Sequence, residues 1–318
     1  MKKEERVMNN LLLKVVYGIL PFGRLFLQII QGKEFGFSFN LADRCPIGCD
    51  CYWRAMGRVK ELTDEQVVEF FHEQKKQGKL HVTTVGGEPY VRPKLLRLVT
   101  PIMPGNWVVT SGTTPLMVLP RTTHFISIDG KNAATHDKVR KMIGLYERIL
   151  KNLTAIRPTG EFPAFIHTVL NAANYRQIGE ILRTWHDNDL ADGVTFSTIT
   201  HIKGGGDDSL LLTRDQQQWI AEELLKQKEV FGNFLCMTEG MITMYKPSRT
   251  ERQTPASCGT AKFIASFDAS CNRIPQCIFS DKGDCSRCGC VITPMIESVT
   301  NFPPSPAAIK LLAHLYTP

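Results

Sequence analysis

The sequence lacks the marks of several broad protein classes. Lys and Arg number 38 against 31 Asp and Glu, yet no basic run is interleaved with aromatic residues, so nucleic acid is not an expected partner. A membrane-spanning helix needs about 20 uninterrupted apolar residues, and the chain contains no such run. Internal repeats and low-complexity segments are also missing. With 43% hydrophobic and 22% charged residues, the composition is that of a globular protein.

The N-terminus lacks the features of a cleavable signal peptide. It begins with the charged segment MKKEERVMNN and has no evident small-residue cleavage site. We therefore expect a cytoplasmic, reducing location. The apolar stretch 11–31 has two interpretations: an amphipathic helix packed on the body of the protein, which we favour, or a peripheral membrane contact. It is interrupted by Lys14, Gly18, Pro21, Gly23 and Arg24.

Cysteine is the residue type that the sequence has in excess. Of ten cysteines among 318 residues, three lie at 45–51, six at 258–290, and Cys236 stands alone. In a reducing compartment, clustered cysteines indicate metal binding rather than disulfides.

The middle of the chain alternates between strand and helix patterns. Strands are expected at 35–40, 80–85, 107–110, 125–128, 163–169 and 194–198, and helices at 62–77, 94–99, 135–156, 175–186 and 213–230. Successive βα units predict an α/β fold with a parallel sheet wound into a full or partial barrel. Chemistry in such folds lies at the C-terminal ends of the strands. After Cys258, short strands, glycines and cysteines indicate a small metal-dependent module that ends with a helix over 306–316.

Cys45, Cys49 and Cys51 directly follow the first strand. Three thiolates within seven residues can hold one face of a [4Fe-4S] cubane and leave the fourth iron open. A structural zinc would need a fourth ligand from elsewhere in the chain.

With these cysteines the sequence resembles the radical S-adenosylmethionine (radical SAM) superfamily. The usual cysteine spacing there is three residues and then two, whereas here Asp50 alone separates Cys49 from Cys51. The shorter spacing removes a position where the family usually carries an aromatic residue, and Tyr52 and Trp53 would supply that contact instead. Gly86-Gly87-Glu88-Pro89, after the second strand, is similar to the GGEP motif of the family.

Polar residues after the later strands extend the resemblance. Ser127-Ile128-Asp129-Gly130, with His136, Asp137 and Arg140 downstream, resembles a further stretch of the family. The resemblance implies a partial (β/α)6 TIM-like barrel with S-adenosylmethionine contacts at Gly86, Gly87, Glu88, Ser111, Ser127, Asp129, Asn171 and Thr198. Capping of the barrel rim is an equal alternative for Asn171 and Thr198.

The segment FDASCNRIPQC resembles the strand pair of twitch or SPASM extensions, with Cys271 at the turn position usually held by Gly. The resemblance implies an auxiliary [4Fe-4S] cluster on Cys258, Cys277, Cys285 and Cys288, with Cys290 as the alternative to Cys288. A structural zinc is the alternative metal. The expected organisation is an N-terminal segment 1–34, a core barrel 35–235 and an auxiliary module 236–318.

The implied function is reductive cleavage of S-adenosylmethionine to a 5′-deoxyadenosyl radical that abstracts hydrogen from a substrate, by an oxidoreductase or transferase. A flavodoxin or ferredoxin would donate the electron. We favour a peptide or small-metabolite substrate over a lipid or isoprenoid. A non-catalytic iron–sulfur carrier or a zinc-stabilised binding protein is the alternative from another class. No catalytic base is assigned, and His136, Asp137 and His201 are considered only by position.

Overall fold

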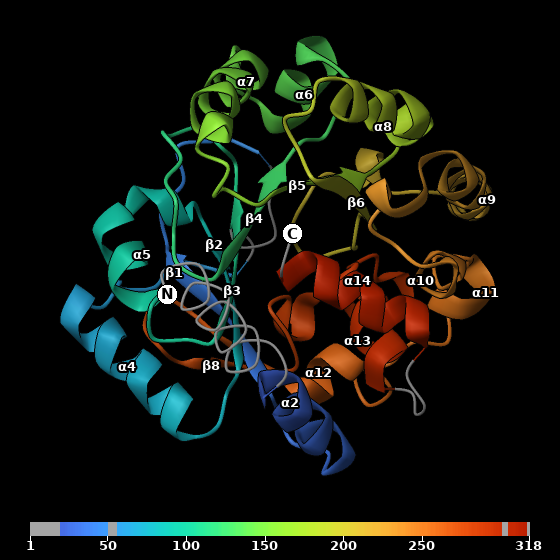
Figure 1. Cartoon of the computed structure of the whole chain (residues 1–318). Helices are drawn as coiled ribbons and strands as arrows, with labels where there is room; N and C mark the ends of the chain where they lie inside the picture. Colours follow the sequence, from blue (N-terminus) through green and yellow to red (C-terminus); the bar gives the residue numbers. More distant parts are fainter. Residues whose placement is uncertain (1–19, 50–55, 301–304, 317–318) are drawn as a thin grey trace, which may run out of the picture.

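An eight-stranded sheet curves around a central space in the computed structural model, which describes residues 20–49, 56–300 and 305–316 (Figure 1). The strand order is β6-β5-β4-β3-β2-β1-β7-β8, and all pairs are parallel except β7 with β8. The strands are β1 Gly36–Ala42, β2 His81–Gly86, β3 Gly105–Thr110, β4 Thr122–Ser127, β5 Ala164–Leu170, β6 Gly193–Thr198, β7 Ile264–Phe267 and β8 Arg273–Ile274. The predicted α/β class and partial barrel are confirmed.

Helices cover the outer face of this sheet (Figure 1). Those that follow the first six strands are α4 Asp64–Lys76, α5 Pro93–Val99, α6 Ala133–Arg140, α7 Leu145–Ile156, α8 Ile178–Asp187 and α9 Arg214–Phe231. The later helices are α10 Glu239–Thr243, α11 Pro247–Thr250, α12 Gly259–Phe263, α13 Ile292–Thr300 and α14 Pro306–Tyr316. Of these, α13 and α14 do not lie on the outer face, because Ile296 and Leu312 line the cavity inside the barrel. Thr63 and Thr213 form capping boxes at the start of α4 and α9, because each hydroxyl accepts the N–H of the glutamine three residues on and that glutamine side chain accepts the threonine N–H.

One predicted helix is two in the structure. The interval 135–156 was expected to be continuous, but α6 ends at Arg140 and α7 begins at Leu145. Lys141 and Gly144 both adopt left-handed backbone conformations, with φ of 54° and 77°, which break the helical hydrogen bonding. Ile143 is therefore 96% exposed rather than part of an apolar face.

The inner and outer faces of the strands carry different side chains. In β1, Phe37, Phe39 and Leu41 point outward into a core shared with α4 and α5, whereas Ser38 faces the interior. This alternation follows from the period of two along a strand. At β1, a polar side chain thus faces the barrel interior, whereas the layer outside the strand is apolar.

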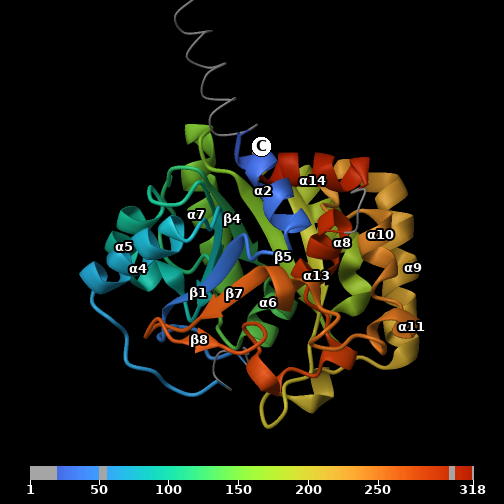
Figure 2. The ribbon, with the colours of Figure 1, turned by 90° about the horizontal axis from the view of Figure 1, so that it is seen from below.

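The cysteine-rich C-terminal segment joins the barrel sheet directly. β7 pairs parallel with β1, in the register Gly36↔Ile264 to Phe39↔Phe267, and β8 follows beside it (Figure 2). The hydroxyls of Ser38 and Ser266 lie 2.8 Å apart across this junction. The boundary at residue 236 stays a prediction.

The described part of the N-terminal apolar stretch forms α2 (Leu20–Ile30), which packs on the body of the protein. Ile29 is buried with Phe35, Phe263, Ile264 and Ile296, and Leu25 packs against them. The favoured interpretation of this stretch agrees with these contacts; residues 11–19 lie outside the described residues. Among the described residues, no helix has the length and hydrophobicity to cross a membrane.

Candidate functional site

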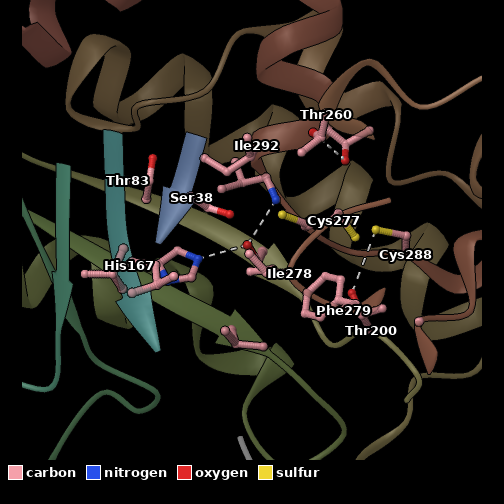
Figure 3. Close-up of a pocket in the computed structure, with 18 of the residues that line it drawn as sticks. Ser38, Thr83, His167, Thr200, Thr260, Cys277, Ile278, Phe279, Cys288 and Ile292 are labelled. Carbon is pink, nitrogen blue, oxygen red and sulfur yellow. Dashed lines mark hydrogen bonds between the residues drawn. The ribbon is translucent and has the colours of Figure 1, made fainter. Parts of the chain in front are cut away.

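A cavity of about 1000 Å³ occupies the interior of the barrel and its C-terminal mouth. Its walls are the inward-facing side chains of the strands, the loop 200–211 and the cysteine-rich segment. In Figure 3 the side chains of Ser38, Thr83 and His167 lie opposite the segment that carries Cys277 and Cys288. The cavity is where the predicted chemistry at the strand ends would take place.

Five cysteines of the C-terminal segment line this cavity together: Cys258, Cys277, Cys285, Cys288 and Cys290. Burial raises the pKa of Cys277 to about 12 and that of Cys288 to about 11. Neighbouring thiolates raise these values further, which means that the thiols lie within electrostatic range of one another. The four predicted auxiliary ligands are therefore brought together, and Cys290 accompanies them.

Backbone contacts fix the 289–291 segment on the end of β6. Thr198 donates its N–H to the carbonyl of Gly289 at 2.9 Å, and Val291 donates to the Ser197 hydroxyl at 3.1 Å. A Cβ atom on Gly289 would lie 2.0 Å from the Thr198 carbonyl oxygen. Glycine is therefore required at this position, between Cys288 and Cys290.

Cys271 and Cys236 lie apart from the five. Cys271 adopts φ of 60°, as expected for a turn position that favours glycine, and its side chain packs against the core outside β1 and β2. Cys236 is completely buried, and its thiol faces the carbonyl of Asn233 at 3.5 Å. No described cysteine forms a disulfide.

The first cysteine group is described in part. Cys49 is buried and lines the cavity, and Cys45 is half-buried beside the adjoining core. Cys51, with Tyr52 and Trp53, lies outside the described residues.

The Gly86-Gly87 pair packs against the chain that leads to Cys45. Gly86 has φ of 110°, and a Cβ on Gly87 would lie 2.1 Å from the carbonyl oxygen of Arg44. Gly87 also donates its N–H to Ala42 at 2.9 Å. The glycines thus let the second strand end approach the cysteine loop.

Glu88 is buried, and protein donors occupy both carboxylate oxygens. Oε1 accepts from the Tyr90 N–H at 3.0 Å and from the Thr110 hydroxyl at 2.7 Å, and Oε2 accepts from both the N–H and the hydroxyl of Ser111. Neither Glu88 nor Ser111 is among the residues that line the cavity. The carboxylate joins the ends of β2 and β3, and its predicted contact with the methionine ammonium stays a prediction.

Four other predicted contact residues do line the cavity: Ser127, Asp129, Asn171 and Thr198. Asp129 pairs with Arg140 at 2.6 Å. The Asn171 side chain accepts the N–H of Ala173 at 2.9 Å, which is the rim-capping arrangement named as its alternative role.

The three polar residues considered by position differ in their surroundings. His136 is buried, and its Nδ1 accepts the N–H of Asp129, while burial lowers its pKa to about 4. Asp137 accepts the N–H groups of Gly144 and Tyr146 before α7. His201 lies at the mouth of the cavity, 3.8 Å from carboxylates of Asp208 and Asp284.

His167 is an interior residue that the sequence analysis did not single out. Its Nε2 lies 2.9 Å from the Ser197 hydroxyl, which also accepts the Val291 N–H (Figure 3). Burial lowers its pKa to about 4, so the ring is neutral at pH 7. The alternation of β5, with Ile166 and Leu170 against the core and His167 and Val169 toward the cavity, was the signal in the sequence that could have identified His167.

Comparison with known proteins gives a relative over part of the chain and solved structures with a similar fold. No protein-family profile matches the sequence. A segment of 154 residues is 30% identical to the AdoMet-dependent heme synthase of Methanosarcina barkeri, over 44% of this chain and 44% of that protein. This partial similarity agrees with the ordered cysteine and GGEP motifs, which resemble those of the radical SAM superfamily.

Solved structures agree with the radical SAM fold. SuiB of Streptococcus suis bound to the precursor peptide SuiA has a TM-score of 0.63 at 12% identity, over 85% of this chain and 67% of SuiB. anSMEcpe with bound AdoMet has a TM-score of 0.60 at 14% identity, over 85% of this chain and 82% of the other. The chain spans less than half of the length of the curated relative that it matches.

Proposed function

We propose that this protein is a radical SAM enzyme whose catalytic [4Fe-4S] cluster is held by Cys45, Cys49 and Cys51. The observation that carries the proposal is that buried Cys49 opens onto the same cavity as the strand-end residues Ser127, Asp129 and Asn171. S-adenosylmethionine would bind there. With both cofactors bound, the site would supply reductive cleavage of the sulfonium to a 5′-deoxyadenosyl radical, which takes hydrogen from the substrate.

The donor set fits an iron–sulfur cluster at the first position. Thiolates are the ligands that hold such clusters, and the cysteine loop is supported from below by the Gly86-Gly87 turn. This support places Cys45 and Cys49 at the C-terminal end of β1, where a bound cofactor would face the cavity rather than solvent.

We further propose an auxiliary [4Fe-4S] cluster on Cys258, Cys277, Cys285 and either Cys288 or Cys290. Burial raises the thiol pKa values of Cys277, Cys285, Cys288 and Cys290, so metal binding there would release protons and replace buried thiols by thiolates paired with the metal. A zinc ion would need four sulfurs about 2.3 Å from one point. Within the described residues no three His, Cys, Asp or Glu side chains form a group that could hold a single metal ion, so the preference for a cluster over zinc rests on the resemblance of the cysteine motifs.

The protein itself would position and enclose the reactants. The Asp129 carboxylate is held by Arg140 and by the Val169 N–H at 2.8 Å, so it presents a fixed wall to the bound cofactor. His167 and Ser197 form a neutral hydrogen-bonded pair on the neighbouring strands β5 and β6. Enclosure by the loop 200–211 and the cysteine-rich segment would keep water from a reactive intermediate.

For the substrate we propose a peptide or small metabolite, oxidised or joined by a new bond. SuiB was solved with a precursor peptide, and that structural relative supports the peptide class here. A flavodoxin or ferredoxin would supply the electron.

Anaerobic reconstitution tests the proposal. With S-adenosylmethionine and dithionite, the wild type should form 5′-deoxyadenosine, and Cys45→Ala should form none. Cys236→Ala is the matched control, because that thiol is buried in the core away from the cavity, and it should retain the activity. If the wild type holds iron–sulfur clusters but forms no 5′-deoxyadenosine, the protein is a non-catalytic iron–sulfur carrier. If it holds stoichiometric zinc in place of iron, it is a metal-stabilised binding protein.

A further inference from the structure

The part of the cavity that lies below the strand ends has an unusual lining for a barrel. Closed βα barrels fill their interior with bulky branched side chains. Here the inward positions of β1, β2, β6 and β7 carry the small hydroxyl residues Ser38, Thr83, Thr195 and Ser266. These side chains leave the interior open at a depth that a packed barrel would fill.

Most of these hydroxyls already have partners. Ser38 and Ser266 bond each other at 2.8 Å, and Thr83 lies 2.8 Å from Nε2 of His81. Thr195 differs, because its residue is only 2% exposed and its hydroxyl has no partner among the described residues. A buried hydroxyl without a partner costs about 1–3 kcal/mol. Because the residue lines the cavity, rotation of the Thr195 side chain would turn this covered hydroxyl toward a ligand oxygen and remove that cost.

The floor beneath the hydroxyls is apolar. Leu25 of α2, Ile296 of α13 and Leu312 of α14 close the N-terminal end of the barrel, together with Phe35 and Ile264. Trp107 and Phe125 line the wall above them. A ligand group that reached this floor would contact hydrocarbon on most sides.

Charged groups are excluded from this depth. The acidic residues that line the cavity, Asp129, Asp207, Asp208 and Asp284, follow the strands at the C-terminal mouth. At the other end, the Arg121 guanidinium faces the backbone carbonyls of Met103 and Pro101. Burial of an ion without a counter-charge is costly, so the lower cavity selects uncharged groups.

We propose that Ser38, Thr83, Thr195 and Ser266, with the apolar floor beneath them, form a chamber that binds an uncharged, largely apolar group carrying a hydroxyl or carbonyl oxygen. We call this the hydroxyl chamber. The inference rests on the proposed function only in naming this group as part of the substrate. An apolar peptide residue, with its backbone carbonyl, and a prenyl alcohol share this chemistry.

Equilibrium dialysis of the reconstituted protein with S-adenosylmethionine tests the chamber. The probes are octan-1-ol, octanoate and octylammonium, which share a chain and differ in charge. The alcohol should bind at least tenfold more tightly than either ion. Competition by N-acetyl-leucinamide or by geraniol then separates a peptide side chain from a prenyl chain as the source. Equal affinity for the three probes, or binding of none, would overturn the proposal.

Two variants locate the binding. Ser38→Phe fills the chamber and should abolish octan-1-ol binding. Thr195→Val keeps the shape but removes the hydroxyl, and should weaken it about five- to tenfold. Thr168→Val is the matched control, since that threonine bonds the Ile128 carbonyl away from the cavity, and it should leave the affinity unchanged. Unchanged affinity in Thr195→Val and in a folded Ser38→Phe contradicts the chamber.

The 5′-deoxyadenosine assay keeps the two proposals separable. Selective alcohol binding by a protein that never forms 5′-deoxyadenosine would retain the chamber and remove the enzymatic function. Formation of 5′-deoxyadenosine without selective binding of the alcohol would retain the enzymatic function and remove the chamber.

Discussion

The carboxylate of Asp129 lies 2.6 Å from the guanidinium of Arg140, and their side chains are only 7% and 13% exposed. The second carboxylate oxygen accepts the N–H of Val169. The pair connects the end of β4 to α6 and faces the cavity. A buried pair of this kind is costly to break because the remaining charge is left without a partner.

Arg140→Gln should therefore lower the free energy of unfolding by about 3–5 kcal/mol, measured by urea denaturation. Lys131→Gln is the matched control, because the Lys131–Glu180 pair is exposed and should contribute less than about 1 kcal/mol. The double variant Asp129→Asn/Arg140→Gln should recover part of the loss. Equal effects of the two single variants would contradict the importance of burial.

Glu88→Gln should destabilise the protein even without any cofactor. An amide nitrogen is a donor and cannot accept the hydrogen bonds that Tyr90, Thr110 and Ser111 give to the carboxylate. In the variant, the amide N–H groups would therefore face other donors without an acceptor. We expect a loss of about 2 kcal/mol in thermal or urea unfolding. If Glu88 serves only a bound ligand, the unfolding free energy will match the wild type and only the affinity for S-adenosylmethionine will fall.

Acid should unfold the protein through its buried histidines. Burial lowers the pKa of His81 and His124 to about 3 and that of His136 and His167 to about 4. Since the unfolded chain binds these protons near pH 6.5 and the folded chain does not, stability is full above pH 6.5 and is lost as pH falls toward 4. Each histidine contributes about 1.4 kcal/mol per pH unit in that window.

His124→Gln tests this pH dependence. The variant should lower the slope of unfolding free energy against pH by about one proton between pH 6 and 5. His72→Gln, at an exposed position of α4, should leave the slope as it is. A slope that does not change in His124→Gln would mean that this ring is protonated in the folded protein.

Iron content should separate the cysteines into ligands and bystanders. If two cubanes are present, the wild type will hold about eight irons per chain, and Cys277→Ala or Cys285→Ala will reduce this to about four. Comparison of Cys288→Ala with Cys290→Ala identifies the fourth ligand. Cys271→Gly should keep the full count, because Cys271 packs outside β1 and β2. Loss of iron in that variant would disprove the proposed ligand set.

Packing of α2 on the barrel floor should be visible in stability. Ile29→Ala removes a buried side chain from the cluster with Phe263 and Ile296 and should cost about 2–4 kcal/mol. Leu27→Ala, on the 55% exposed side of the same helix, should cost less than about 0.5 kcal/mol. Equal losses in the free energy of unfolding, measured by urea denaturation, would contradict the packing of α2 through Ile29 rather than through Leu27.

The sequence was sufficient for the barrel because strand and helix periods alternate over most of it. It did not reveal the break at Lys141, since a left-handed residue that is not glycine leaves no pattern in composition. The grouping of Cys258 with Cys277 and Cys285 followed from motif order. The inclusion of Cys290 depends on contacts between 289–291 and the end of β6, which join residues about 90 positions apart.

Glu88 and Ser127 illustrate the limits of motif reasoning at the site. Ser127 ends β4 and Glu88 comes shortly after β2, yet Ser127 lines the cavity and Glu88 does not. What differs is local hydrogen bonding: Ser111 and Thr110 lie within reach of the Glu88 carboxylate. Such a contact depends on the spacing of neighbouring strand ends, which periodicity alone does not provide.

The parallel pairing of β1 with β7 has a consequence for how the chain is made. Ser38 and Ser266 meet across 228 positions, so during synthesis one edge of β1 stays open until most of the polypeptide has left the ribosome. Unpaired strand edges recruit other strands and promote aggregation. The edge of β1 must therefore be protected from intermolecular pairing until β7 has been synthesised. Shortened chains that end before residue 264 should accumulate as insoluble material.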